Sequence, residues 1–119
     1  MTPVSTPDPP EDSRFADAAR AAARVARVAA NAVAEVDLTL AQYRVLVFVD
    51  GVDRPATEVA RLLGVSPSTL TSVVDGLCGR DLVQRLSDPA DGRRVVLSIT
   101  DDGRARVARA DAAVADRLS

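Results

Sequence analysis

Apolar residues recur every three or four positions along residues 14–36, a spacing that places them on one face of an α-helix. This face comprises Phe15, Ala18, Ala22, Val25, Ala29, Val33 and Val36. The opposite face carries Arg20, Arg24 and Arg27, which we interpret as a solvated surface. Most of the apolar side chains are small, so another helix can approach closely, either from the same domain or from a second copy of the chain.

A second helix is predicted at residues 40–50. Thr39 is a favourable N-cap, and Gln42 three places later completes a capping box, in which each side chain accepts a hydrogen bond from the other residue's backbone. The apolar side of this helix comprises Leu40, Tyr43, Leu46 and Val47. Gly51 is expected to end it.

The stretch "PATEVARLLGVSPSTLTSVVDGL" predicts two helices joined by a sharp turn. The first covers residues 56–63 and stops at Gly64, because glycine readily adopts the left-handed conformation that such a turn needs. Ser66 then caps the second helix, and Pro67 stands at its first position, where the missing N–H costs nothing. This is the pattern of a helix-turn-helix, a motif typical of DNA-binding domains.

Two short strands are predicted next, at residues 82–87 and 93–100, with the turn residues "DPADG" between them. The second strand alternates, with Val95, Leu97 and Ile99 on one face. Thr100 is then placed to cap a last helix. A β-hairpin that follows a helix-turn-helix predicts a winged helix, so the fold class is mainly α with a small β-hairpin.

The tip of this hairpin carries two adjacent arginines, Arg93 and Arg94. In a winged helix the second helix of the motif lies in the major groove of DNA, and the hairpin reaches the flanking phosphates or the minor groove. The negative potential of a narrow minor groove favours arginine. Asp91, two residues earlier, is placed to hold the Arg93 guanidinium by a bidentate pair.

Three stretches resemble the MarR family of transcriptional regulators in their order and spacing: "LTLAQYRVL", "ATEVARLLGVSPSTLTSVVDGLCGRDLVQR" and "DPADGRRVVLSIT". The resemblance implies a homodimer that presents two winged helices to a pseudo-palindromic operator. It also implies that Arg93 contacts the minor groove, that Asp91 orients it, and that a small molecule, often phenolic, releases the DNA. The family usually has glycine where this chain has Asp81.

We therefore expect a Pro-rich disordered tail at residues 1–13 and a single MarR-like domain at residues 14–119. Within that domain, residues 38–100 form the winged helix-turn-helix lobe. The helices at residues 14–36 and 101–119 are expected to mediate dimerisation.

The predicted DNA-facing surface of the second helix in the motif is rich in hydroxyl groups. We expect DNA contacts from Ser66, Ser68, Thr69, Thr71, Ser72, Arg93 and Arg94. The outward face also carries Asp75, and it has no Arg, Lys, Asn or Gln to make a strong bidentate contact with a base. Residues 38–99 hold seven arginines and seven acids, a neutral balance that predicts modest affinity.

Composition narrows the other possibilities. The chain has no histidine, which excludes His-based catalysis and His-containing metal sites, and its net charge is −2. No nucleophile–base arrangement appears, so we expect no enzyme, no catalytic or metal-binding residues and no cofactor. The single Cys78 suggests a reducing cytoplasm and is interpreted as a half-buried small hydrophobic residue. The longest apolar run, residues 45–49, is too short to cross a membrane.

Two hypotheses remain. The first is a cytoplasmic, dimeric DNA-binding regulator, most simply a repressor that responds to a ligand. The second is a winged-helix protein–protein interaction module in which DNA binding is weak or lost, which the neutral lobe favours. Binding of duplex DNA that weakens with salt distinguishes the first from the second.

Overall fold

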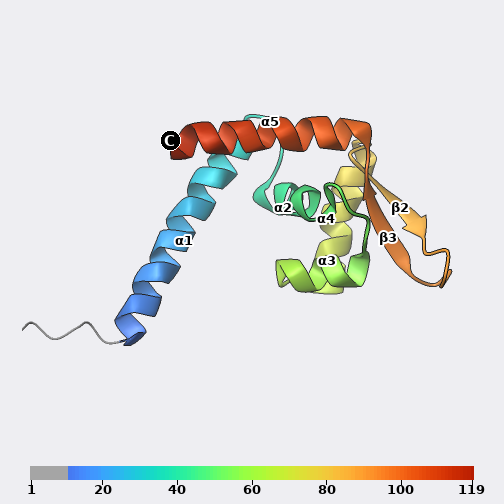
Figure 1. The fold of residues 1–119 in the computed structure, drawn as a ribbon, viewed down its shortest axis with the longest axis horizontal. Helices are drawn as coiled ribbons and strands as arrows, with labels where there is room; N and C mark the ends of the chain where they lie inside the picture. Colours follow the sequence, from blue (N-terminus) through green and yellow to red (C-terminus); the bar gives the residue numbers. More distant parts are fainter. Residues whose placement is uncertain (1–10) are drawn as a thin grey trace, which may run out of the picture.

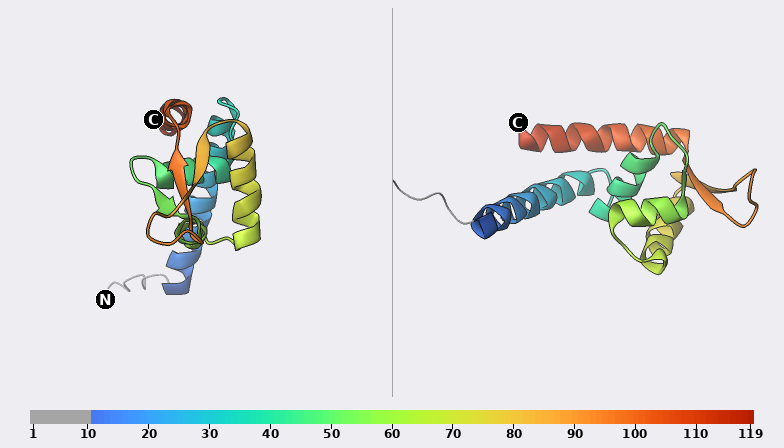
Figure 2. Two further views of the ribbon diagram at one scale, coloured as in Figure 1. Left: turned by 90° about the vertical axis from the view of Figure 1, so that its right-hand side faces the viewer. Right: turned by 60° about the horizontal axis from the view of Figure 1, so that its bottom comes forward.

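A computed structural model describes residues 11–119, which form five helices and a small three-stranded antiparallel sheet (Figure 1). In chain order the elements are α1 (Glu11–Ala34), α2 (Leu40–Val49), β1 (Arg54–Pro55), α3 (Ala56–Leu63), α4 (Pro67–Gly79), β2 (Val83–Ser87), β3 (Val95–Ile99) and α5 (Asp101–Leu118). Helices α2, α3 and α4 and the sheet make a lobe on one side of α5, and α1 projects away from that lobe (Figures 1 and 2). The predicted fold class, a winged helix-turn-helix with flanking helices, is confirmed.

Helix α1 begins earlier than the sequence pattern predicts. A disordered tail is expected at residues 1–13, and residues 1–10 of it lie outside the described residues. Residues 11–13 are helical, so the expectation is wrong for these three residues. Glu11 and Asp12 lie in the first turn of α1, where their negative charge interacts favourably with the positive end of the helix dipole. The polar start of this segment therefore belongs to the helix and not to the tail.

The two halves of α1 have different surroundings. In the C-terminal half, Ala29, Ala32 and Val33 are buried, and this part of α1 packs against α5. In the N-terminal half, Phe15 is 64% exposed and Val25 is 50% exposed, although both belong to the predicted apolar face. Helix α5 and the lobe together therefore cover only the second half of that face.

The predicted helix caps are all present. Thr39 Oγ1 accepts a hydrogen bond from Gln42 N–H at 3.1 Å, and Gln42 Oε1 accepts one from Thr39 N–H at 3.0 Å, which completes the capping box. Gly64 has φ +71°, the left-handed conformation expected in the turn between α3 and α4. Thr100 Oγ1 accepts from Gly103 N–H at 2.9 Å and so caps α5.

The inner face of α2 differs from the predicted one. Val47 is 44% exposed, whereas Val45 and Val49 are fully buried beside Leu46. All but two residues of this helix are apolar or aromatic, so its pattern does not single out one face.

The hairpin of β2 and β3 is the predicted wing, and Arg85 of β2 lies opposite Leu97 of β3. On β3 the predicted inner face is buried at Leu97 and Ile99 and becomes exposed at Val95, nearer the tip. A third strand, β1, pairs antiparallel with β3 through two residues, Arg54 and Pro55. The sequence pattern does not predict β1, because two residues are too few to show an alternation.

The wing and the helix-turn-helix share one core. Leu46 of α2, Leu77 of α4 and Leu97 of β3 are all at most 1% exposed and belong to the same buried cluster. Because side chains from the sheet and from α4 pack closely against one another in this core, the wing keeps a fixed position relative to α4.

Helix α5 is also fixed to the lobe by polar contacts. The Tyr43 hydroxyl of α2 donates a hydrogen bond to Asp111 of α5 at 2.5 Å. Burial, then this hydrogen bond and the negative charge of Asp111, raise the pKa of Tyr43 to about 12. The phenol therefore keeps its proton, and the contact between α2 and α5 persists across the neutral pH range.

Candidate nucleic-acid interface

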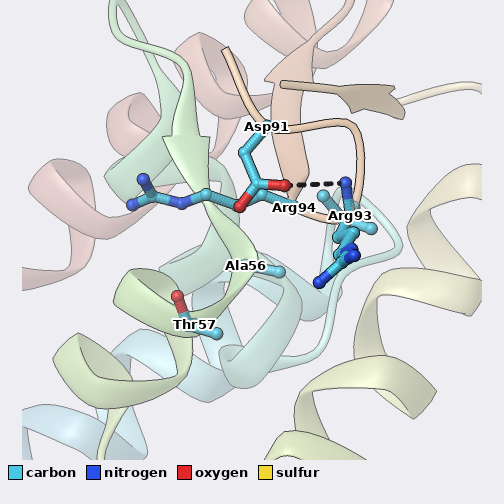
Figure 3. A pocket seen from close by; sticks show the side chains of 6 residues that line it. Ala56, Thr57, Asp91, Arg93 and Arg94 are labelled. Atoms are coloured by element: carbon cyan, nitrogen blue, oxygen red, sulfur yellow. Dashed lines mark hydrogen bonds between the residues drawn. The ribbon is translucent and has the colours of Figure 1, made fainter. Parts of the chain in front are cut away.

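The tip of the wing and the N-terminal end of α4 lie on one face of the lobe. Because β1 runs antiparallel to β3, the chain leaves β1 towards the tip of the wing and there begins α3. An open hollow of about 470 Å³ lies between the tip of the wing and the first turn of α3 (Figure 3). It is lined by Ala56, Thr57, Asp91, Arg93, Arg94 and Val95. A smaller hollow of about 90 Å³ is lined by Ala56, Thr57, Ala60, Pro67, Leu70 and Thr71 and connects the same end of α3 with α4.

The first predicted DNA-facing group is a set of hydroxyls at the start of α4. Ser66 Oγ accepts a hydrogen bond from Thr69 N–H at 3.2 Å, as an N-cap does, and donates one to Thr69 Oγ1 at 2.9 Å. Ser68 Oγ lies 3.2 Å from Ser66 Oγ. All three residues are exposed, so this end of α4 offers solvent a connected cluster of hydroxyls.

The other two predicted hydroxyls are exposed but already bonded to their own helix. Thr71 Oγ1 donates to the Pro67 carbonyl at 2.9 Å, and Ser72 Oγ donates to the Ser68 carbonyl at 3.3 Å. A hydroxyl has one proton, and phosphate oxygens only accept, so each must rotate away from its carbonyl to donate to a phosphate. If they do not rotate, the hydroxyl oxygens of Thr71 and Ser72 can still accept hydrogen bonds from the amino groups of cytosine or adenine in the major groove.

Asp75, the one acid on this face of α4, has a partner that the sequence pattern does not predict. Arg85 of β2 reaches across to α4, where its Nη2 lies 2.6 Å from Asp75 Oδ1 and donates to the Thr71 carbonyl at 3.4 Å. Its Nη1 lies 3.8 Å from the sulfur of Cys78, which is half-buried as expected. No spacing rule relates a strand to a helix ten residues away, so the sequence carried no signal for this pair.

Asp91 does not act as predicted. Its carboxylate accepts a hydrogen bond from the backbone N–H of Arg93 at 3.1 Å, and no ion pair with the Arg93 guanidinium exists in the described part of the chain. The expected bidentate pair is therefore wrong, because a side chain two residues earlier in a tight turn reaches the backbone before it reaches the end of a long side chain. Asp91 orders the turn, not the guanidinium.

The two tip arginines differ in their contacts. Arg94 Nη1 lies 3.8 Å from the carboxylate of Asp88, which also accepts from Ala90 N–H at 2.8 Å. Arg93 has no ion pair within residues 11–119, and its side chain is exposed. Figure 3 shows the two guanidinium groups pointing in different directions from the edge of the hollow. One duplex can therefore meet them at two different places.

Three of the seven arginines of this neutral lobe form ion pairs. Carboxylates neutralise Arg54, Arg85 and Arg94 through contacts of 2.6 to 3.8 Å. Arg61 of α3 and Arg93 of the wing have no such partner among residues 11–119. Both line the hollows beside Thr57, so free positive charge lies where the wing approaches α3.

Residues 11–119 contain no helix long and apolar enough to cross a membrane. The same residues contain no cluster of three or more Cys, Asp or Glu side chains arranged to bind a metal ion.

Comparison with known proteins identifies relatives of this fold. A model of the MarR family matches residues 36–94. A comparison with curated proteins finds no match.

Among solved structures, the transcriptional repressor CouR bound to a 23-mer DNA duplex is 38% identical, with a TM-score of 0.77, and the match covers 95% of this chain and 82% of CouR. CouR from Rhodococcus jostii RHA1 bound to p-coumaroyl-CoA also matches, at 30% identity and a TM-score of 0.76, over 83% of this chain and 71% of that one. A MarR family transcriptional regulator from Rhodococcus sp. RHA1 has 25% identity and a TM-score of 0.83, over 93% and 80% of the two chains. The protein belongs to the MarR family of winged-helix, DNA-binding transcriptional regulators.

Proposed function

We propose that the protein is a transcriptional repressor that binds a pseudo-palindromic operator as a homodimer. The observation that carries the proposal is the shared face of α4 and the wing, where exposed hydroxyls and the unpaired Arg93 border adjoining hollows. The similar protein CouR is a repressor whose structure contains a DNA duplex, which supports the same partner for this chain.

In this proposal the hydroxyl cluster of α4 meets the major groove and the wing meets the adjacent minor groove. Ser66, Ser68, Thr69, Thr71 and Ser72 contact bases or phosphates, Arg93 enters the minor groove, and Arg94 binds a flanking phosphate. Asp91 supports Arg93 by ordering the turn of the wing. Because the groups that α4 offers to the bases in this proposal are hydroxyls, sequence preference depends in part on the shape of the minor groove.

The homodimer is supported by apolar side chains that the lobe leaves uncovered. Phe15 of α1 is 64% exposed and Leu118 at the end of α5 is 52% exposed. A second copy that packs its α1 and α5 against these helices would remove this apolar area from water. Light scattering should give the mass of a dimer, and Phe15→Glu should shift the protein towards the monomer without unfolding the lobe.

The ligand response is supported by CouR, whose structure with p-coumaroyl-CoA shows that a similar protein binds a small molecule with a phenolic group. We propose that a phenolic effector releases DNA from this protein as well. Titrating p-coumaroyl-CoA into the protein–DNA complex should lower the fluorescence anisotropy of the labelled duplex. An unchanged signal at saturating concentration would exclude this compound as the effector.

The central experiment compares two arginine variants. Labelled duplexes from the DNA that flanks the gene are titrated with wild type, Arg93→Ala and Arg20→Ala at two salt concentrations. Arg93→Ala should weaken binding about tenfold or more, because it removes a groove contact, and Arg20→Ala, a change on the exposed face of α1, should not.

Two outcomes contradict the proposal in different ways. Equal affinities for Arg93→Ala and Arg20→Ala would remove the wing from DNA binding. If the wild type bound no duplex even at low salt, the protein–protein interaction module would become the better hypothesis, as the seven arginines and seven acids of residues 38–99 already allow.

A further inference from the structure

The turn between α1 and α2 is held by arginines from two other helices. The carbonyl of Val36 accepts a hydrogen bond from Arg106 of α5 at 2.9 Å. The next carbonyl, that of Asp37, accepts one at 2.5 Å from Nη1 of Arg80, the C-cap residue of α4. The end of α1 is therefore bonded both to α5 and to the end of α4.

The C-terminal end of α4 has few side chains to fix it in place. Gly76 and Gly79 both lie in its last turn, and both are exposed. A glycine inside a helix leaves the backbone more freedom than other residues do. Leu77 is the one fully buried side chain of this turn. The bond from Arg80 to the α1–α2 turn therefore adds a second anchor to an end of α4 that packing holds at few points.

A dimer that binds a pseudo-palindromic operator must hold its two α4 helices as far apart as the two half-sites, about 34–36 Å for one turn of DNA. In the proposed dimer α1 packs against the second copy, so this separation depends on how each α4 is held relative to its own α1. We propose that Arg80 determines how strictly the dimer selects the spacing of the half-sites. The inference rests on the proposed function and makes Arg80 a positioning residue for DNA binding.

Arg80 lies far from the groups that are proposed to meet DNA. The hydroxyl cluster of Ser66, Ser68 and Thr69 is at the N-terminal end of α4, and Arg80 is at the opposite end of this helix of 13 residues. At a rise of 1.5 Å per residue, the two ends are about 20 Å apart. The Arg80 guanidinium is also engaged by the Asp37 carbonyl. Arg80 therefore affects DNA binding through the placement of α4 and not through a contact with the duplex.

The test uses the full chain and an operator taken from a bound genomic fragment. Three duplexes carry its two half-sites at the natural spacing, one base pair closer and one base pair farther apart, and a fourth carries a single half-site. The wild type should bind the two altered spacings about tenfold more weakly than the natural one. Arg80→Met keeps the unbranched stem and removes the donors, and it should reduce this penalty to about threefold or less. Its affinity for the single half-site should equal that of the wild type.

Two further variants control for charge and for folding. Arg80→Lys keeps a positively charged donor and should retain most of the wild-type spacing penalty. Arg109→Met removes an exposed arginine of α5, and thus the same charge, and it should bind all four duplexes as the wild type does. Thermal melts should show that each variant is folded at the temperature of the titrations, since Arg80 and Arg109 are both exposed.

Four results would overturn the inference. A spacing penalty in Arg80→Met equal to that of the wild type would refute it and leave the proposed function intact. A loss of the same factor on every duplex, the single half-site included, would make Arg80 a direct DNA contact. Equal binding of the three spacings by the wild type would leave no selectivity for Arg80 to determine. If the wild type bound no duplex, the proposed function would fail, and this inference with it.

Discussion

The base and the tip of the wing are parts of one hairpin, but they are built differently. At the base, Thr100 Oγ1 donates to the Asp81 carbonyl at 2.6 Å, and Thr100 N–H donates to the Leu82 carbonyl at 3.1 Å. Here Gly103 is so closely packed that a Cβ would overlap the Leu82 carbonyl oxygen. At the tip, by contrast, a Cβ on Gly92 would meet nothing within 4 Å.

The bonds that hold the tip are short-range ones within the turn. Asp88 N–H donates to the Arg94 carbonyl and Arg94 N–H to the Asp91 carbonyl, each at 2.9 Å. No side chain of the tip is buried. The difference indicates that the base fixes where the wing lies and that the tip is free to meet a partner. Substitutions at the base should therefore change stability, and substitutions at the tip should change binding.

The largest effect is expected for Gly103→Ala. The new methyl group would collide with backbone at Leu82 and lie 2.7 Å from Cγ1 of Ile99, and backbone cannot move aside cheaply. We expect the free energy of unfolding to fall by about 3 kcal/mol, as in an overpacked core. Urea denaturation followed by circular dichroism measures it.

Gly92→Ala is the matched change at the tip, where the same methyl group enters open space. Its unfolding free energy should stay within about 0.5 kcal/mol of the wild type. Equal destabilisation by the two substitutions would show that base and tip do not differ as the packing indicates.

A middle-sized effect is expected for Arg85, which lies between base and tip and contacts α4. Arg85→Ala leaves the Asp75 carboxylate without its partner 2.6 Å away, on the face proposed to meet DNA. The repulsion between this carboxylate and phosphates should weaken DNA binding about fivefold, while stability changes by no more than about 1 kcal/mol because both side chains are partly exposed. Anisotropy titrations and urea melts on the same samples separate the two effects.

The double variant Arg85→Ala/Asp75→Asn tests the cause. If the unpaired charge is responsible, removing it should restore most of the affinity. A double variant as weak as Arg85→Ala alone would instead make Arg85 a direct DNA contact.

A smaller effect, confined to binding, is expected for Asp91. Asp91→Ala removes the carboxylate that accepts a hydrogen bond from Arg93 N–H at 3.1 Å. The turn should then be less ordered, and Arg93 should no longer be held in one position. Affinity should fall about threefold, equivalent to the roughly 0.5–1 kcal/mol of one hydrogen bond, with an unchanged melt. Asp91→Asn keeps the acceptor oxygen and should bind as the wild type does. Weak binding by Asp91→Asn would instead indicate that the charge of Asp91 matters, as in the Asp91–Arg93 ion pair expected from the sequence.

The base of the wing shows which features could be predicted from sequence. The caps at Thr39, Ser66 and Thr100 and the left-handed Gly64 were predicted correctly, because each depends on one residue type within a few positions. Buried Leu97 and Ile99 followed from alternation along β3. Local rules were therefore sufficient for the frame of the lobe.

Features that depend on residues far apart could not be predicted. The Arg85–Asp75 pair joins a strand to a helix, and β1 is recognisable only through its pairing with β3. The uncovered Phe15 had the same helical spacing as buried Val33, because spacing identifies a face but not what covers it. Arg80 was overlooked for the same reason, since its bond to the turn between α1 and α2 exists only in three dimensions.

The smallest effect, and one of opposite sign, is expected at Asp81, where α4 passes into the base of the wing. Asp81 has φ +58°, a left-handed conformation that L-residues adopt at a cost and that glycine adopts freely. Its carbonyl bond to Thr100 belongs to the backbone and survives substitution. Asp81→Gly should therefore raise the free energy of unfolding by about 0.5 kcal/mol, the relief of strain being partly offset by the greater freedom of glycine in the unfolded chain. DNA affinity should not change, because the substitution acts at the base. A destabilised protein would mean that the Asp81 side chain contributes a stabilising contact, and a weaker DNA complex would mean that the base of the wing takes part in binding.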